Sequence, residues 1–241
     1  MKLFGSVHKK QEHRCGAVIV AAGVSRRMRG TDKIMAELCG APVILHTLRA
    51  FEESPYIDEI VLVTRPELSA ELKLLAAREN IRKLTAVVPG GVTRADSVTQ
   101  GLLALHKKTR LAAIQDGARP LVTGEIIEQA VEQAICCGAA APAVPLKDTV
   151  KVVDDGGRVL STPDRETLRA VQTPQVFDRD LLIAAWKKVK DDGISCTDDC
   201  GAMEHLGKVV YLTEGSEENI KITTPLDLIL AAEILKGREM P

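Results

Sequence analysis

The sequence predicts an α/β fold in which a doubly wound, mostly parallel sheet carries helices on both faces. Short apolar runs alternate with segments whose apolar residues recur at helical spacing, and this alternation continues as far as Pro145. Aromatic residues are scarce, with one Trp, two Tyr and three Phe in a chain of 241 residues. The core must therefore consist of Ala, Val, Leu and Ile, which is typical of helices packed on a parallel sheet.

Five runs before Pro145 have the composition of buried strands, because they are short, apolar and bounded by turn residues. They cover residues 17–22, 59–64, 83–88, 111–115 and 139–144. The segments between them have the periodicity of amphipathic helices, over residues 42–52, 68–79, 93–106 and 125–137. The third helix begins Thr-Arg-Ala-Asp, which places a carboxylate in its first turn, where the helix dipole favours negative charge.

The alternation breaks at Pro145 and resumes after residue 175. Here the sequence predicts a β-hairpin, because an Asp-Asp-Gly-Gly turn at 154–157 separates two short extended pieces. A hairpin that projects from a sheet cannot bury its own faces. We therefore expect a protruding β-arm at about residues 145–175 that pairs with a second copy in a homodimer. Beyond it, helices are expected at 180–190, 198–206 and 225–235, and a strand at 208–212.

Composition and charge exclude several classes of partner. The net charge of −1 gives no electrostatic basis for binding nucleic acid or a membrane surface, and no apolar run approaches the length of a membrane span. Residues 1–14 are expected to form a poorly ordered extension, with a targeting remnant as the alternative, and residues 15–241 a single domain. The six cysteines form no CxxC pair. Reduced thiols of a cytoplasmic protein are the favoured interpretation, and a metal clamp by Cys196 and Cys200 is the alternative.

The most informative feature is the small-residue turn Ala21-Ala22-Gly23, which follows a predicted strand and precedes a basic segment that ends at Lys33. Small residues let a ligand approach the backbone closely, so that N–H groups and cations converge on a polyphosphate. The segment is neither a GxGxxG dinucleotide fingerprint nor a Walker A loop. The alternative is an ordinary turn with exposed basic residues.

Three further segments carry candidate chemistry. Paired glycines at 90–91 precede a hydroxyl-rich helix start, which is either another pocket wall or an ordinary helix cap. Asp116 follows a strand at the edge where ligands of open α/β sheets bind, and it is either a metal ligand or the partner of Arg119. Lys221 lies between two Ile residues, and it either meets an anion or points to water from an edge strand.

Together these segments form a family pattern that runs across about residues 15–236. The matching pieces are Ala-Ala-Gly-x-x-x-Arg-Met…Lys (21–33), Gly-Gly-x-x-Arg-x-Asp-Ser-Val (90–98), Asp-Gly-Ala-Arg-Pro (116–120), Val-Pro-x-x-Asp-Thr-Val-Lys (144–151), Asp-Arg…Thr-Pro-Gln-x-Phe (164–177), Thr-Asp-Asp (197–199) and Asn-Ile-Lys-Ile-Thr-x-Pro-x-Asp (219–227). On these pieces the chain resembles the 2-C-methyl-D-erythritol 4-phosphate cytidylyltransferases of the non-mevalonate isoprenoid pathway. The resemblance implies a Rossmann-like sheet of the nucleotide-diphospho-sugar transferase type, with a protruding β-arm.

The resemblance further implies that CMP passes from CTP to 2-C-methyl-D-erythritol 4-phosphate, with Mg²⁺ as cofactor and pyrophosphate as leaving group. It assigns Arg27 and Lys33 to stabilisation of the transition state, and Arg165 and Lys221 to positioning of the attacking phosphate. Asp116 is the expected metal ligand. The residues assigned to substrate binding are Ala21, Ala22, Gly23, Gly91, Arg94, Ser97, Asp116, Arg119, Thr149 and Thr173. Because Arg165 lies in the arm, each active site is expected to be shared between two subunits.

The sequence departs from the family pattern at three places. The loop before Lys33 is one residue short and puts Asp32 beside that lysine, where its charge would reduce the positive potential. Ser25 replaces a more usual Gly, and Val92 stands where an acidic residue is common. Two alternative functions are therefore kept: transfer to ribitol 5-phosphate or another polyol phosphate, and CTP binding with weak activity.

Overall fold

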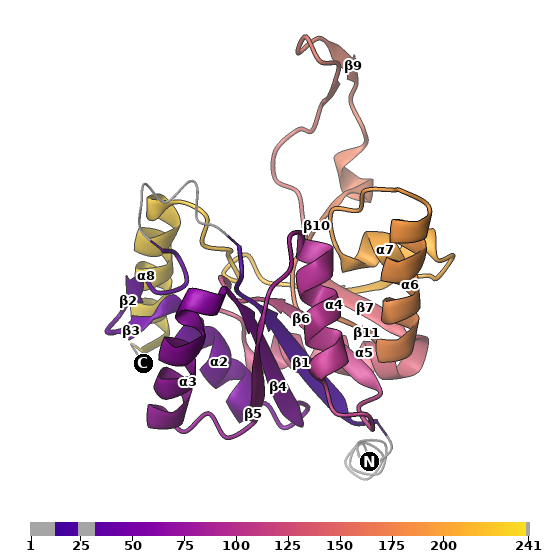
Figure 1. The fold of residues 1–241 in the computed structure, drawn as a ribbon. Coiled ribbons are helices and arrows are strands. Elements are labelled where there is room, and N and C mark those ends of the chain that lie inside the picture. Colours follow the sequence, from indigo (N-terminus) through magenta and orange to yellow (C-terminus); the bar gives the residue numbers. More distant parts are fainter. Residues whose placement is uncertain (1–12, 24–31, 240–241) are drawn as a thin grey trace, which may run out of the picture.

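In the computed structural model, which describes residues 13–23 and 32–239, strands from along the whole chain meet in one central sheet. Its strands are β1 (Cys15–Val20), β4 (Glu59–Thr64), β5 (Leu84–Pro89), β6 (Leu111–Asp116), β7 (Ala139–Pro145), β10 (Arg169–Val171), β11 (Gln175–Asp178) and β12 (Tyr211–Glu214). They lie in the order β10-β7-β11-β6-β1-β4-β5 (Figure 1). The remaining strand, β12, pairs with β7.

Most strand pairs of the central sheet are parallel, as predicted. β1 pairs in parallel with β4 and β6, β4 pairs in parallel with β5, and β12 runs parallel to β7. The exceptions are β11, which lies antiparallel between β6 and β7, and β10, which is antiparallel to β7. The sequence did not predict these two strands, because they have only three and four residues and follow directly on irregular segments.

Helices cover both faces of the sheet, so the prediction of a doubly wound fold is confirmed (Figure 1). On one face, buried apolar side chains of the sheet pack against α2 (Val43–Glu53), α3 (Ser69–Arg78), α5 (Gly124–Cys137) and α8 (Pro225–Glu239). On the other face, they pack against α4 (Arg94–Ala104), α6 (Arg179–Asp191) and α7 (Asp199–His205). Phe51 of α2 and Phe177 of β11 are the largest fully buried side chains, and the rest of both cores is mainly aliphatic.

Short elements complete the chain. The antiparallel pair β2 (Glu37–Leu38) and β3 (Ala41–Pro42) leads into α2. Two 3₁₀ turns, η1 (Pro66–Leu68) and η2 (Arg165–Thr167), precede α3 and β10.

The β-arm projects from the body of the molecule (Figure 1). Its strands β8 (Val152–Val153) and β9 (Val159–Ser161) form a separate two-stranded sheet. Asp154 closes the turn by accepting hydrogen bonds from the N–H groups of Gly156 and Arg158 at 3.1 and 2.9 Å. The prediction extended the arm to residue 175, whereas β10 pairs with β7 from Arg169 onward. The arm is therefore shorter than expected, because its last residues join the central sheet.

The predicted extension at residues 1–14 lies mostly outside the described residues. Arg14 is described, and its carbonyl accepts hydrogen bonds from the N–H groups of Arg110 and Leu111 at 3.0 and 3.1 Å. This contact ties the start of β1 to the start of β6. Among residues 13–23 and 32–239, no helix has the length and apolar character needed to cross a bilayer.

Candidate active site

A cavity of about 460 Å³ lies where β1, β5 and β6 end, at the carboxyl edge of the sheet. Ligands of open α/β sheets bind at this edge. The residues that line the cavity are Val20, Ala21, Ala22, Gly23, Lys33, Ile34, Gly91, Val92, Thr93, Arg94, Ser97, Asp116, Ala118 and Lys221. All four segments that the sequence singled out for chemistry therefore contribute to one cavity.

The small-residue turn is held against two neighbouring strands. The N–H of Ala21 donates to the carbonyl of Val63 at 2.7 Å. Behind the turn stands Gly90, where an added Cβ would lie 2.3 Å from the Cβ of Ala22 and 2.9 Å from Oγ of Ser97. No side chain fits there, so Gly90 is what lets the first and second segments approach each other.

The loop after β5 is both a cavity wall and a helix cap, the two interpretations that the sequence left open. Thr93 and Asp96 form a capping box at the start of α4. Oγ of Ser97 accepts a hydrogen bond from the N–H of Gly91 at 3.1 Å and donates one to the carbonyl of Thr93 at 3.0 Å. The helix cap thus fixes the loop that forms the cavity wall, and Arg94 extends from the first turn of the same helix.

Asp116 is a carboxylate of the cavity lining, and cationic side chains surround it. Its Oδ2 lies 2.8 Å from Nζ of Lys221 and 3.7 Å from Nε of Arg119. Burial raises the pKa of Asp116, but the charges of Lys221, Arg94 and Arg119 outweigh burial and hold that pKa below its ordinary value. The carboxylate is therefore ionised at neutral pH. The Lys221 side chain remains 40% exposed, so its ammonium is accessible to an anion in the cavity.

Arg119 and Thr173 support the cavity rather than line it. Arg119 donates from Nη1 to the carbonyl of Asn219 at 2.5 Å, which holds the segment that carries Lys221. Oγ1 of Thr173 accepts a hydrogen bond from the N–H of Asp116 at 3.1 Å. The buried amide of Asn219 donates to the carbonyl of Thr173 at 3.1 Å and so closes this network.

Asp199 is an important residue to which sequence reasoning assigned no role. It is fully buried at the start of α7, and its Oδ2 accepts a hydrogen bond from Nη2 of Arg94 at 2.6 Å. Its Oδ1 accepts one from the indole of Trp186 at 2.9 Å. Burial raises the pKa of Asp199, whereas Arg94 and Trp186 oppose that rise. The Thr-Asp-Asp motif at 197–199 was the available signal, but its partner is 105 residues away along the chain.

Other predicted residues lie elsewhere. Arg165 donates from Nη1 to the carbonyl of Lys147 at 2.8 Å, at the base of the arm, and it does not line the cavity of its own chain. Thr149 is exposed in the arm segment and also lies outside the lining. Arg27 lies outside the described residues, as does Ser25. The structure therefore places Lys33 and Lys221, but not Arg165, at the cavity.

Two of the three departures from the family pattern, at Asp32 and at Val92, fall on residues that the structure describes. Val92 lines the cavity, and so does Lys33, the neighbour of Asp32. Lys33 lines it although the preceding loop is one residue short. Val92 lines it with a fully exposed side chain, so the loop presents an apolar group where the pattern commonly has an acidic one. The six cysteines are free thiols, and burial raises the pKa of Cys200.

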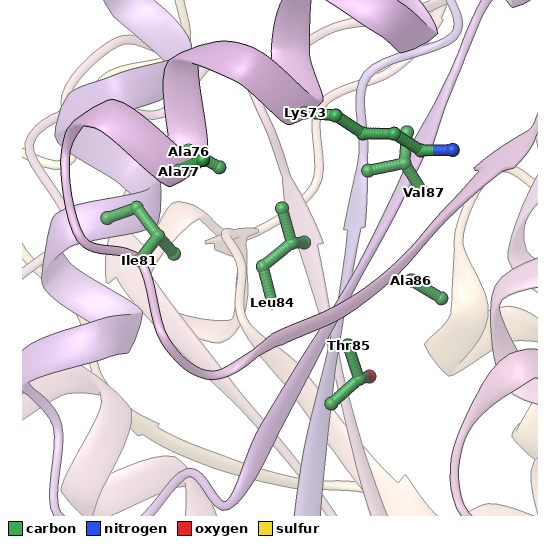
Figure 2. A pocket seen from close by; sticks show the side chains of 8 residues that line it. All are labelled: Lys73, Ala76, Ala77, Ile81, Leu84, Thr85, Ala86 and Val87. Carbon is green, nitrogen blue, oxygen red and sulfur yellow. The ribbon is translucent and has the colours of Figure 1, made fainter.

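A second hollow, of about 270 Å³, lies between α3 and the edge strand β5 (Figure 2). Its lining is Lys73, Ala76, Ala77, Ile81, Leu84, Thr85, Ala86 and Val87. Among the described residues, Lys73 supplies the one ionisable side chain in this lining, whereas the cavity at the carboxyl edge combines a carboxylate with cations. The chemistry of the residues therefore favours the cavity at the carboxyl edge as the active site.

Comparisons with known proteins agree with the resemblance. One family model, described as 2-C-methyl-D-erythritol 4-phosphate cytidylyltransferase, matches residues 15–237. A protein of that name from Desulforamulus reducens is 48% identical over 225 residues, which cover 92% of this chain and 96% of the relative. Another from Dehalococcoides mccartyi is 48% identical over 223 residues, covering 92% of this chain and 96% of the relative.

Solved structures show the same fold. A 4-diphosphocytidyl-2C-methyl-D-erythritol synthase from Anaerococcus prevotii superposes with a TM-score of 0.84 and 31% identity, covering 95% of this chain and 99% of that one. A 2-C-methyl-D-erythritol 4-phosphate cytidylyltransferase from Thermus thermophilus gives a TM-score of 0.74 with 28% identity, covering 91% of this chain and 98% of that one. The predicted Rossmann-like fold is confirmed by this likeness.

Proposed function

Because the chain belongs to the 2-C-methyl-D-erythritol 4-phosphate cytidylyltransferase family, we propose that it transfers CMP from CTP to 2-C-methyl-D-erythritol 4-phosphate in isoprenoid precursor synthesis. The observation that carries the proposal is the convergence of the glycine turn, the loop after β5, Asp116 and Lys221 on one cavity. The free state of all six cysteines favours a cytoplasmic location over an oxidising compartment.

In the proposed reaction, a phosphate oxygen of the acceptor attacks the α-phosphorus of CTP. A new P–O bond forms while the bond from the α-phosphorus to the bridging oxygen breaks, and that oxygen leaves with the electron pair as part of pyrophosphate. The attacking phosphate is already ionised at neutral pH, so no general base is needed. The protein must therefore align the two phosphates and stabilise the negative charge between them.

The cavity residues suit this task. Ala22 has only a methyl side chain and Gly91 has none, which leaves backbone groups accessible to a nucleotide base. Lys33 and Lys221 both line the cavity, and we assign Lys33 to the nucleotide phosphates and Lys221 to the acceptor phosphate. Lys221 exchanges its ion pair with Asp116 for the incoming dianion, which its partial exposure allows.

Asp116 is the residue proposed to hold Mg²⁺. Magnesium in nucleotide sites is commonly bound through one or two carboxylates together with substrate phosphates. A single carboxylate whose pKa is held below its ordinary value fits this chemistry, because it stays ionised as a hard oxygen ligand. When bound, the metal would neutralise charge on the triphosphate.

A homodimer in which the arm reaches the partner's cavity completes the proposal. The apolar side chains of Val152, Val153, Val159 and Leu160 in the arm are each about half exposed, between 44% and 58%. An unsupported two-stranded ribbon gains stability by packing such side chains against a partner. Arg165 at the base of the arm then acts in the partner's active site.

The test of function uses the purified protein with CTP, Mg²⁺ and either 2-C-methyl-D-erythritol 4-phosphate or ribitol 5-phosphate. Pyrophosphate release that depends on methylerythritol phosphate supports the proposal. Release that depends on ribitol 5-phosphate alone would assign the other acceptor. Calorimetric CTP binding without turnover on either acceptor would leave only a CTP-binding module.

Shared sites are tested by mixing two inactive variants, Lys221→Ala and Arg165→Ala, after partial unfolding and refolding. A mixed dimer places both changes in one site and leaves the other site intact. We expect roughly a quarter of wild-type activity to return in an equal mixture, because half of the dimers are mixed. Mixed dimers that form without any return of activity would show that each site uses its own Arg165.

A further inference from the structure

Arg65 connects two parts of the cavity wall, the small-residue turn that ends at Gly23 and the residues around Lys33. It follows Thr64, the last residue of β4. Its Nη2 donates a hydrogen bond to Oδ2 of Asp32, and its Nη1 donates to the carbonyl of Gly23 at 3.4 Å. Gly23 and Lys33, the neighbour of Asp32, both line the cavity. One guanidinium thus bonds to both Gly23 and Asp32, which are the residues that precede and follow residues 24–31 in the chain.

Asp32 is also anchored on its other side. Its Oδ1 accepts a hydrogen bond from the N–H of Ile34 at 3.0 Å. Ile34 is 1% exposed, and its carbonyl accepts a hydrogen bond from the N–H of Ile44 in α2 at 3.1 Å. Lys33 is therefore flanked by one residue fixed to the core and one fixed to the end of β4.

The ion pair between Arg65 and Asp32 is partly shielded from water. The two side chains are 19% and 25% exposed, so their interaction is screened less than that of a surface pair. Arg65 also contacts Glu67 at 3.1 Å, but the Glu67 side chain is 67% exposed and well solvated. Asp32 is consequently the principal partner of the guanidinium.

The geometry points to Arg65 as a positioning residue for nucleotidyl transfer, an inference that rests on the proposed function. Arg65 neutralises the carboxylate that this chain places beside Lys33, and it holds Lys33 at a set distance from the Gly23 wall. The departure at Asp32 is thus compensated within the fold. An uncompensated Asp32 would lower the positive potential that the nucleotide phosphates meet.

The experiment compares Arg65→Ala, Arg65→Lys, Asp32→Asn and the double variant Arg65→Ala/Asp32→Asn with wild type. Arg78→Ala serves as the control, because Arg78 lies on α3 with a side chain that is 73% exposed. Steady-state rates with CTP and the acceptor are measured together with calorimetric binding of CTP and Mg²⁺ alone. Thermal unfolding of each variant separates lost positioning from lost folding.

We expect Arg65→Ala to lower kcat by about 10- to 100-fold while KM for methylerythritol phosphate changes little. Arg65→Lys restores part of this loss because it keeps the charge. The double variant is no slower than Arg65→Ala, since the two residues act as a unit. An unchanged kcat in Arg65→Ala, or losses that multiply in the double variant, would overturn the inference.

The outcome is separable from failure of the proposed function. If wild type binds CTP but does not form CDP-methylerythritol, the proposed function fails. The inference about Arg65 is then judged on CTP affinity, which Arg65→Ala is expected to weaken by about tenfold relative to Arg78→Ala. Equal affinities in these two variants would refute it.

Discussion

Gly90→Ala is the substitution whose effect follows most directly from the geometry. The added Cβ would lie 2.3 Å from the Cβ of Ala22 and 2.9 Å from Oγ of Ser97. Carbon atoms in contact normally lie about 3.5–4.0 Å apart, so Ala22 must move by more than about 1 Å. Neither neighbour can give way by changing rotamer, because the Cβ of Ala22 is fixed to the backbone and Ser97 is bonded to Gly91.

The expected cost of this overpacking is about 1–3 kcal/mol of unfolding free energy. In a chain of this size each kcal/mol lowers Tm by about 2–4 °C. Because Ala22 and Ser97 both line the cavity, displacing them by about 1 Å is expected to reduce kcat/KM for CTP by about 10²-fold.

Gly124→Ala is the matched control, since a Cβ at the start of α5 meets nothing within 4 Å. The control should be neutral or stabilising by up to about 1 kcal/mol, because it restricts the unfolded chain without a clash. Thermal unfolding and CTP titration of both variants give the comparison. If Gly90→Ala matches Gly124→Ala in both Tm and CTP affinity, the conclusion that Gly90 lies in close contact with Ala22 and Ser97 is wrong.

Three other outcomes are expected. Lys221→Ala removes the cation that is paired with Asp116 and should lower the transfer rate by about 10²–10³-fold in steady-state assays, and an unchanged rate would refute its role. Asp199→Ala leaves Arg94 without its buried partner and should cost about 3 kcal/mol in urea unfolding, and a loss below about 1 kcal/mol would contradict the pairing. Burial raises the pKa of Asp227, but hydrogen bonds from the segment before α8 outweigh it and leave that pKa below its ordinary value. The carboxylate therefore contributes stability above its unfolded pKa that is lost as pH falls through the folded value, and Asp227→Asn should flatten this acid limb in urea titrations below about pH 4.

Much of the fold was predictable because its information is local. Apolar periodicity and turn residues marked the parallel strands and their helices, and Thr93 and Asp96 marked the cap of α4. The two antiparallel strands β10 and β11 were not predicted, because they are too short to show an alternation of apolar and polar residues. Their place in the sheet depends on pairing with β6 and β7, which are earlier in the chain.

The glycine turn, Asp116 and Lys221 were identifiable as candidates from the sequence. The turn and Asp116 each follow a predicted strand, and Lys221 is a charged residue between two Ile residues. Their partners were not identifiable. Asp199 meets Arg94 across 105 residues and Arg65 meets Asp32 across 33, and no local pattern encodes either contact. Sequence by itself determined the family and most of the strand–helix order, and it predicted candidate side chains for the site, since these depend on short-range propensity and motif. Only the tertiary structure decided which charges are neutralised and how close the cavity walls stand, because both depend on the order of strands across the sheet.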